Sequence, residues 1–271
     1  MAACSATKRA RTPALEARVA TLSIPGLGKN AGSPYERAGS RDENKTAANG
    51  IFVLANGTRL FSSAWPGKIQ VHLKPSGWLV TMTGNDCEDF MEWGGEDGQD
   101  GEGITSRFNL PRGLTIDRAG NMVVVDSLNN AIRKVNKEGT VVSTLAGNWL
   151  FQEGFEAVDA GQLFADGQGE NARFNKPWSV VVAANEELIV SDTGNHSIRV
   201  LTPQGAVHTL CGNGKAGFAD GNGADARFNE PRGLALDPMG NLLVADFGND
   251  AIRLVTMAGA VSTGIFFSGN R

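Results

Sequence analysis

The 271-residue chain is long enough for one large all-β domain or two smaller ones, and its 41% hydrophobic content supports a sizeable core. Its net charge of −4 provides no basic field to attract nucleic acid, so nucleic acid is not an expected partner. The three cysteines include no C-x-x-C pair, which argues against a disulfide framework and indicates a reducing compartment.

Residues 1–48 form a polar N-terminal tail whose composition predicts that it is largely disordered. This tail lacks the continuous apolar stretch of a secretory signal, and no run in the chain approaches the roughly 20 apolar residues that span a bilayer. A short basic cluster at Lys8–Arg11 is weak evidence for nuclear localisation. We therefore expect a cytoplasmic or nuclear protein that is neither secreted nor bound to a membrane.

The rest of the chain repeats itself. The tripeptide R-F-N occurs three times, and proline follows each copy one residue later. Each repeat also holds an aspartate 18 residues after its phenylalanine and an arginine seven residues after that aspartate. These residues are Phe108, Phe174 and Phe228, then Asp126, Asp192 and Asp246, then Arg133, Arg199 and Arg253. A more divergent fourth copy at Asn49–Gly84 has Ser63 at the aspartate position.

Each repeat predicts four short strands separated by glycine-rich turns. In the last repeat these strands are Gly233–Leu236, Leu242–Ala245, Ala251–Val255 and Ala260–Thr263. One such antiparallel sheet cannot bury both of its faces alone, whereas copies packed face to face bury them. Radial repetition of the sheets then predicts an all-β fold of the β-propeller type.

The repeat resembles the NHL repeat. The pattern that carries the resemblance is P-x-G, then D-x-x-G-N, then D-x-x-N-[HND]-x-I-R, and Ser191–Leu201 (SDTGNHSIRVL) matches it closely. The resemblance covers Asn49 to about Thr263 and implies an NHL-type β-propeller. It also implies protein binding, and a link to ubiquitin ligases through arrays of this kind that are joined to BTB domains.

We predict a propeller over residues 49–271, with four recognisable four-stranded blades at about 49–84, 108–147, 174–212 and 228–264. NHL propellers usually have six blades, so four blades predict an incomplete or open array. A four-bladed closed ring is the alternative. An open arc would expose two sheet faces as partner-binding surfaces.

The turns between the second and third strands emerge on the same side of a propeller as the linkers between blades. The linker segments 84–112 and 147–177 carry eight acidic and two basic residues, and five acidic and two basic residues, respectively. The third linker, 212–232, is balanced. The linker face is therefore expected to be acidic, which argues against RNA binding because lysine and arginine contacts to phosphate supply most of that affinity.

Two groups of aromatic residues fall in linkers and are candidates for partner binding, because aromatic residues in loops often make interface hot spots. The alternative is that they pack as local cores. The candidates are Trp149, Phe151, Phe155, Phe164 and Trp178 in the longest linker, and Phe90 and Trp93 upstream.

The residues that recur once per repeat are predicted to be structural. The aspartates are expected to cap the turn that follows by accepting backbone N–H bonds. A contact between aspartate and arginine across neighbouring strands or blades is expected to orient that turn, as an exposed ion pair worth about 0–1 kcal/mol. In the linker ADGNGADARFNEP, Asp220-Gly221 is expected to make a turn and Phe228 to fill the gap between blades.

Other chemistry is weakly supported. The G-x-G-x-x-A spacing at Gly221 precedes a strand rather than a helix, and Pro231 stands where a calcium loop needs glutamate. The three histidines, His72, His196 and His208, occupy different positions of their repeats and so do not predict a shared metal site. We predict no catalytic, cofactor-binding or metal-binding residues.

The favoured function is a non-enzymatic scaffold that binds proteins through the linker face, with no cofactor. This scaffold would serve in substrate recognition within a larger protein such as a ubiquitin-ligase component. The alternative is a metal-dependent propeller enzyme, similar to a lyase or lactonase, with its site in the central channel. Ligand binding at the mouth of the channel is a third, weaker hypothesis.

Overall fold

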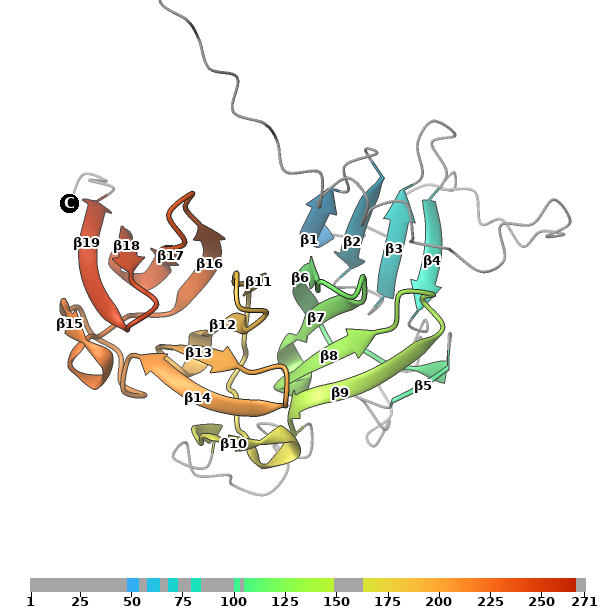
Figure 1. Cartoon of the computed structure of the whole chain (residues 1–271), viewed down its shortest axis with the longest axis horizontal. Coiled ribbons are helices and arrows are strands. Elements are labelled where there is room, and N and C mark those ends of the chain that lie inside the picture. The colour runs from blue at the N-terminus through green and yellow to red at the C-terminus, as the bar shows by residue number, and fades with distance from the viewer. Residues whose placement is uncertain are drawn as a thin grey trace, which may run out of the picture.

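The computed structural model describes residues 48–53, 58–63, 68–72, 79–83, 100–102, 105–148 and 163–266. It is an all-β array of four antiparallel sheets, which we call blades 1 to 4 in chain order. The blades follow one another around an open arc, with blade 1 and blade 4 at its two ends (Figure 1). The predicted incomplete or open array is confirmed, and the four blades do not close into a ring.

Blade 1 has four strands in sequential order. They are β1 (Ala48–Val53), β2 (Arg59–Ser63), β3 (Lys68–His72) and β4 (Leu79–Thr83). The core strands of blade 2 are β6 (Pro111–Ile116), β7 (Met122–Asp126), β8 (Ala131–Val135) and β9 (Val141–Gly147). Those of blade 3 are β11 (Val180–Val182), β12 (Leu188–Asp192), β13 (Ser197–Leu201) and β14 (Ala206–Cys211). Those of blade 4 are β16 (Pro231–Leu236), β17 (Leu242–Asp246), β18 (Ala251–Val255) and β19 (Ala260–Phe266).

Blades 2 to 4 each gain a fifth strand that the sequence pattern did not predict. It is two residues long, comes from the linker before the blade, and pairs with the outermost long strand. These strands are β5 (Gly101–Glu102), β10 (Gly167–Gln168) and β15 (Gly221–Asn222). Each linker is therefore fastened to the outer edge of the blade that it precedes. The expectation that Asp220-Gly221 makes a turn is wrong, because Gly221 begins a strand.

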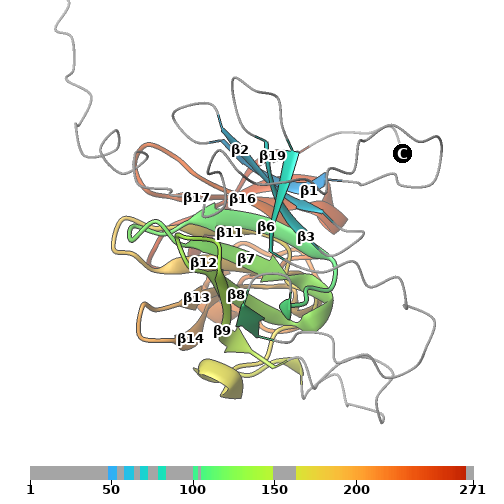
Figure 2. The ribbon, with the colours of Figure 1, turned by 90° about the vertical axis from the view of Figure 1, so that its right-hand side faces the viewer.

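Three apolar clusters hold neighbouring blades together. Between blades 2 and 3, Val123, Ile132 and Phe174 are buried with Val190 and Leu201. The cluster between blades 3 and 4 has the same design, and Phe228 is fully buried in it beside Ile189 and Ile198. In edge-on view, with the sheet of blade 2 facing the viewer, the inner strands β6, β11 and β16 lie together in the middle of the array (Figure 2).

The outer side of blade 4 repeats this apolar face but nothing covers it among the described residues. Ile189 of blade 3 is fully buried, whereas Leu243, at the same position of blade 4, is 38% exposed. Likewise Cys211 is fully buried and Ile265 is 58% exposed. The inner strands show the same contrast: a Cβ on Gly113 would lie 2.7 Å from Ser179 Cα, whereas Gly233 has only Ala245 Cβ nearby, at 3.6 Å.

We predict that Ile189→Ala lowers the free energy of unfolding by about 2–5 kcal/mol, because it leaves a cavity in a packed interface. Leu243→Ala, at the equivalent position of blade 4, should cost less than about 1 kcal/mol because its side chain is already half in water. Urea unfolding followed by circular dichroism measures both. Equal losses would show that the two faces are covered alike.

Candidate functional site

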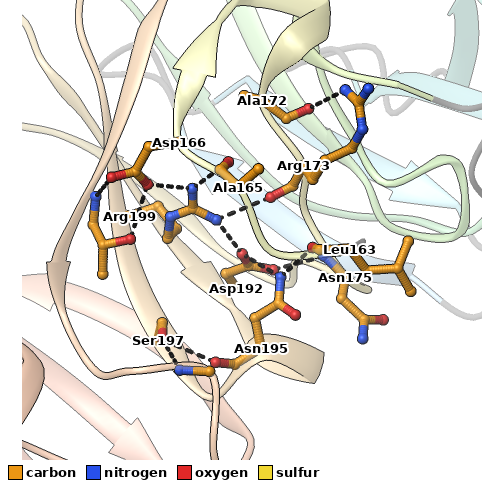
Figure 3. A network of polar contacts seen from close by, with 12 residues as sticks. Leu163, Ala165, Asp166, Ala172, Arg173, Asn175, Asp192, Asn195, Ser197 and Arg199 are labelled. Carbon is orange, nitrogen blue, oxygen red and sulfur yellow. Dashed lines mark hydrogen bonds and ion pairs between the residues drawn. The ribbon is translucent and has the colours of Figure 1, made fainter. Parts of the chain in front are cut away.

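An arginine is buried between two aspartates in each of blades 2 to 4. In blade 3, Arg199 Nη1 donates to Asp192 Oδ2 at 2.7 Å, and Nη2 donates to Asp166 Oδ1 at 2.7 Å (Figure 3). Arg199 and Asp192 are fully buried, whereas the side chain of Asp166 is 54% exposed. The matching sets are Arg133 with Asp126 and Asp100, and Arg253 with Asp246 and Asp220.

The same arginine also binds backbone carbonyls of the linker. Arg199 donates to the carbonyls of Arg173 at 3.0 Å and Ala165 at 2.8 Å. Its guanidinium carbon lies 4.9 Å and 5.4 Å from the ring centroids of Phe164 and Phe174. One guanidinium therefore joins β12, β13, the linker and the phenylalanine that fills the blade interface.

The repeated aspartates are fully occupied by hydrogen bonds. Asp192 Oδ1 accepts from the Asn175 backbone N–H at 2.8 Å, and Oδ2 accepts from Asn195 in the following turn at 2.9 Å. Burial raises the pKa of Asp126 and Asp192 to about 6, while Arg133 and Arg199 act in the opposite direction. A shifted, buried carboxyl group can mark a catalytic site, but recurrence in every blade and complete bonding indicate a structural role.

The predicted contact between aspartate and arginine is present in each of blades 2 to 4, but the expectation that it is an exposed ion pair is wrong. Arg133, Arg199 and Arg253 are fully buried because the linker folds back over them. A pair of this kind behaves differently from a surface pair, since removal of one partner leaves a buried charge uncompensated.

The histidine of the motif has a structural task at the boundary between blades 3 and 4. His196 Nδ1 accepts from the Glu230 backbone N–H at 3.1 Å, as Asn130 Oδ1 accepts from Lys176 N–H at 2.8 Å one blade earlier. Burial lowers the pKa of His196, which favours the neutral ring that can accept this bond. Within the described ranges, no three His, Cys, Asp or Glu side chains are grouped so that they could hold a metal ion.

A different group of side chains gathers at the mouth of the central channel, on the linker face. The residues just after the repeated prolines are Arg112, Trp178 and Arg232, and they lie at the start of the inner strands. The Arg112 guanidinium carbon lies 3.4 Å from the Trp178 ring centroid, and that of Arg232 lies 4.4 Å from it. Arg232 also stacks on Phe247 at 3.4 Å. We call these four residues the mouth cluster.

Trp178 of the mouth cluster lines a central cavity of about 350 Å³. All four inner strands contribute to its lining, which includes Trp178, Leu114, Val180 and Leu234. The hydroxyl-bearing residues Thr115 and Ser179 also lie there. A cavity of this size falls in the lower part of the range of small-molecule pockets.

The aromatic residues predicted to bind a partner lie in different surroundings. Trp178 belongs to the mouth cluster, and Phe164 packs against Arg199 and the turn at Gly214. The other candidates, Trp149, Phe151, Phe155, Phe90 and Trp93, lie outside the described residues. Sequence reasoning missed Arg112 and Arg232, although both stand at the position of Trp178 in their own repeats.

Three of the acidic side chains of the linkers form bonds within the blades. Asp100, Asp166 and Asp220 were counted as surface charge, but each accepts a charge-assisted hydrogen bond from a buried arginine. Each also accepts from a threonine of the outer strand: Thr144, Thr209 or Thr263. These three carboxylates are therefore offset by charges inside the blades.

Comparison with known proteins places the repeat in a family. The family model for the NHL repeat matches residues 174–201 and 228–253. The chain is 32% identical over 157 residues to Protein SUPPRESSOR OF QUENCHING 1, chloroplastic, from Arabidopsis thaliana, which covers 56% of this chain and 14% of that protein. It is 34% identical over 162 residues to NHL repeat-containing protein 2 from Bos taurus, covering 55% and 21%. The match therefore spans a small part of either relative.

Solved structures support the same fold. An auxiliary nutrient binding protein from Bacteroides thetaiotaomicron matches 80% of this chain and 48% of its own, with a TM-score of 0.56 and 22% identity. A streptogramin B lyase matches 80% of this chain and 54% of its own, with a TM-score of 0.51 and 14% identity. At these identities the likeness concerns the fold alone.

We predict that Asp192→Asn lowers the free energy of unfolding by about 3–5 kcal/mol, because it takes a carboxylate from the buried Arg199. Asp166→Asn, which changes the half-exposed partner of the same arginine, should cost up to about 1 kcal/mol. Urea unfolding of both variants measures the difference. Similar losses would contradict the distinction between buried and exposed partners.

Proposed function

The chain carries NHL repeats, and on that basis we propose that it is a non-enzymatic scaffold that binds a protein partner through the linker face. The observation that carries this proposal is the mouth cluster, which places Arg112, Trp178 and Arg232 together where the linkers emerge. Tryptophan and arginine are the residue types most enriched at interface hot spots, and here stacking holds them in place.

The fate of the repeated polar residues supports the same proposal. The aspartates, asparagines and arginines that recur in the blades bond to one another and to the backbone. The recurring polar residues thus join each linker to its blade. We propose that residues that differ between repeats, such as Trp178, recognise the partner. Trp149, Phe151 and Phe155 belong in sequence to the linker before blade 3, and we propose that they extend the contact area.

We further propose that the array is the recognition part of a larger assembly in the cytoplasm or nucleus, associated with substrate choice by a ubiquitin ligase. The match covers 14% and 21% of these two relatives, so in each of them the NHL repeats are one part of a longer protein. We propose the same arrangement here. No helix among the described residues has the length and apolar character needed to cross a membrane. Cys211, a buried free thiol whose pKa burial raises to about 12, is compatible with a reducing compartment.

The alternative is a metal-dependent enzyme with a site in the central channel, as in a lyase or lactonase. Solved structures similar in fold include a streptogramin B lyase and a putative gluconolactonase, at 14% and 16% identity. The cavity lining given by the inner strands is made of apolar, glycine and hydroxyl residues with Trp178. We favour the scaffold because no His, Cys, Asp or Glu is among the described residues that line this cavity.

Affinity capture from cells tests the scaffold. We expect a Trp149/Phe151/Phe155→Ser triple variant, or Trp178→Ala, to lose specific partners about tenfold relative to the unaltered chain. Met239→Ser is the matched control, since Met239 is 87% exposed on the opposite face, in the turn between β16 and β17. Quantitative mass spectrometry reads out all variants. A partner set unchanged in both linker-face variants would overturn the proposal.

Elemental analysis tests the alternative. We expect the purified chain, dialysed without chelator, to contain zinc and calcium far below one ion per molecule, because the described residues group no three metal ligands. Thermal unfolding should likewise be unaffected by EDTA. Stoichiometric metal that resists dialysis would favour the enzyme.

A further inference from the structure

The two ends of the open arc carry the two halves of an interface that is complete elsewhere in the array. Between consecutive blades, one blade contributes the side that points forward along the chain, and the next contributes the side that points back (Figure 1). We call these sides the leading face and the trailing face. The two faces that remain at the ends are the leading face of blade 4 and the trailing face of blade 1.

The leading face of blade 4 keeps the apolar residues of a packed face. Leu243 and Ile265 stand in the same register as Ile189 and Cys211 of blade 3, which are fully buried in the cluster with blade 4. In blade 4 the two residues are 38% and 58% exposed. Removal of this apolar surface from water would stabilise a complex, as it stabilises the contact between blades 3 and 4.

The trailing face of blade 1 is also apolar and exposed. Phe52 packs into the cluster between blades 1 and 2, so its strand neighbours Ile51 and Val53 point to the other side of the sheet. They are 58% and 57% exposed. Leu234 and Leu236 hold the same two positions in blade 4, where they pack against blade 3. The trailing face of blade 1 therefore has residues of the kind that a leading face accepts.

A polar acceptor lies on the same end of the array as the apolar residues of blade 4. Asn130 and His196 accept the backbone N–H groups of Lys176 and Glu230, which lead into the next blade. Asp250 holds the same position as Asn130 and His196, with the same φ of +49°, and it is exposed. Blade 4 thus repeats the polar part of the contact as well as the apolar part.

The aromatic ring between blades is placed differently at the two ends. In the interface of blades 2 and 3, a Cβ on Gly147 would lie 3.1 Å from Cδ2 of Phe174, the phenylalanine between these blades. Blade 4 has Phe266 in the register of Gly147, and this residue is 60% exposed. Counted back from Gly50, blade 1 has Lys45 at the position of the phenylalanine in its repeat. Blade 4 therefore supplies an aromatic ring where blade 1 brings none.

The same position favours another chain as the source of the cover. At Gly147 and Gly212 the backbone turns into the next linker with φ of +93° and +94°, a conformation that favours glycine over other residues. Phe266 stands at this point in blade 4, so the glycine turn that leads into a following blade is not repeated. A second copy of the chain presents a trailing face of the required kind.

We propose that the leading face of blade 4 binds the trailing face of blade 1 in a second copy of this chain. Leu243 and Ile265 are then covered by Ile51 and Val53 of the other copy, and Phe266 lies between the two blades. Because the two faces differ, the contact is head to tail, and each copy can engage one neighbour at each end. This contact uses the ends of the array and goes beyond the function proposed for the linker face.

Sedimentation equilibrium of the full chain under reducing conditions tests the contact. We expect the mean mass to rise with protein concentration above the 28.5 kDa of one chain. Ile265→Asp and Val53→Asp should each remain at the mass of one chain, because either change puts an unpaired carboxylate into the contact. A mass of one chain for the unaltered protein at every concentration would overturn the proposal.

Met239→Asp is the matched control. Met239 is 87% exposed in the turn between β16 and β17, away from both faces, so this variant should associate like the unaltered chain. Thermal unfolding at low protein concentration should be alike in all three variants, which excludes misfolding as the cause of lost association. Loss of association in Met239→Asp as well would contradict the assignment to the two faces.

Mixing the variants distinguishes this contact from other kinds of association. Ile265→Asp keeps an intact trailing face and Val53→Asp keeps an intact leading face, so their equimolar mixture should form complexes of two chains and none larger. A mixture that stays at the mass of one chain would overturn the proposal. Association that persists in Val53→Asp alone would show that blade 4 pairs with blade 4, and would also overturn it.

These measurements are independent of partner capture through the linker face. If the unaltered chain stays single while Ile265→Asp loses a protein captured from cells, the leading face belongs to a different partner and the second copy is excluded. Loss of partners in the linker-face variants would uphold the scaffold in either case.

Discussion

A guanidinium buried between two carboxylates is the interaction on which blades 2 to 4 depend. The linker before each blade is rich in glycine and carries one aspartate, Asp100, Asp166 or Asp220, that pairs with the buried arginine of that blade. Arg199 reaches Asp166 in this linker and Asp192 in the second strand of the blade, 33 and 7 residues away. Because arginine has five donors in a rigid fork, one side chain can bind both carboxylates and two carbonyls at once.

Once the linker is held, the packing between blades follows. The phenylalanine after each linker, such as Phe174 or Phe228, is directed into the interface and is buried there. The side chains of Asn130 and His196 then accept the N–H of the residue before the next proline. Polar bonds inside the blades therefore set the position of the apolar contacts between them. The polar residues that recur in each blade therefore serve to join the linker to the blade.

Much of the fold is predictable because local patterns and packing agree. Strands of alternating apolar residues between glycine turns, such as Ala251–Val255, are found where the pattern places them. The fifth strands were missed because two residues, such as Gly221 and Asn222, carry no periodic signal and pair only because Asp220 is tied to Arg253. The burial of Arg253 was also missed, because an arginine on a strand is normally exposed to solvent. Only the structure shows that the linker covers this side chain.

By itself, the sequence determined the repeat, the all-β class, the phenylalanines between blades, and the aspartates and arginines that recur once in each of blades 2 to 4. These features recur in register, so comparison of one repeat with the next reveals them. Only the tertiary structure decided between the open array and the alternative closed ring of four blades, and brought Arg112, Trp178 and Arg232 into one cluster. The three residues are 66 and 54 positions apart, and they meet because the inner strands converge around a common axis. Convergence arises from the way whole blades pack, which is a property of the assembled sheets and not of any single repeat.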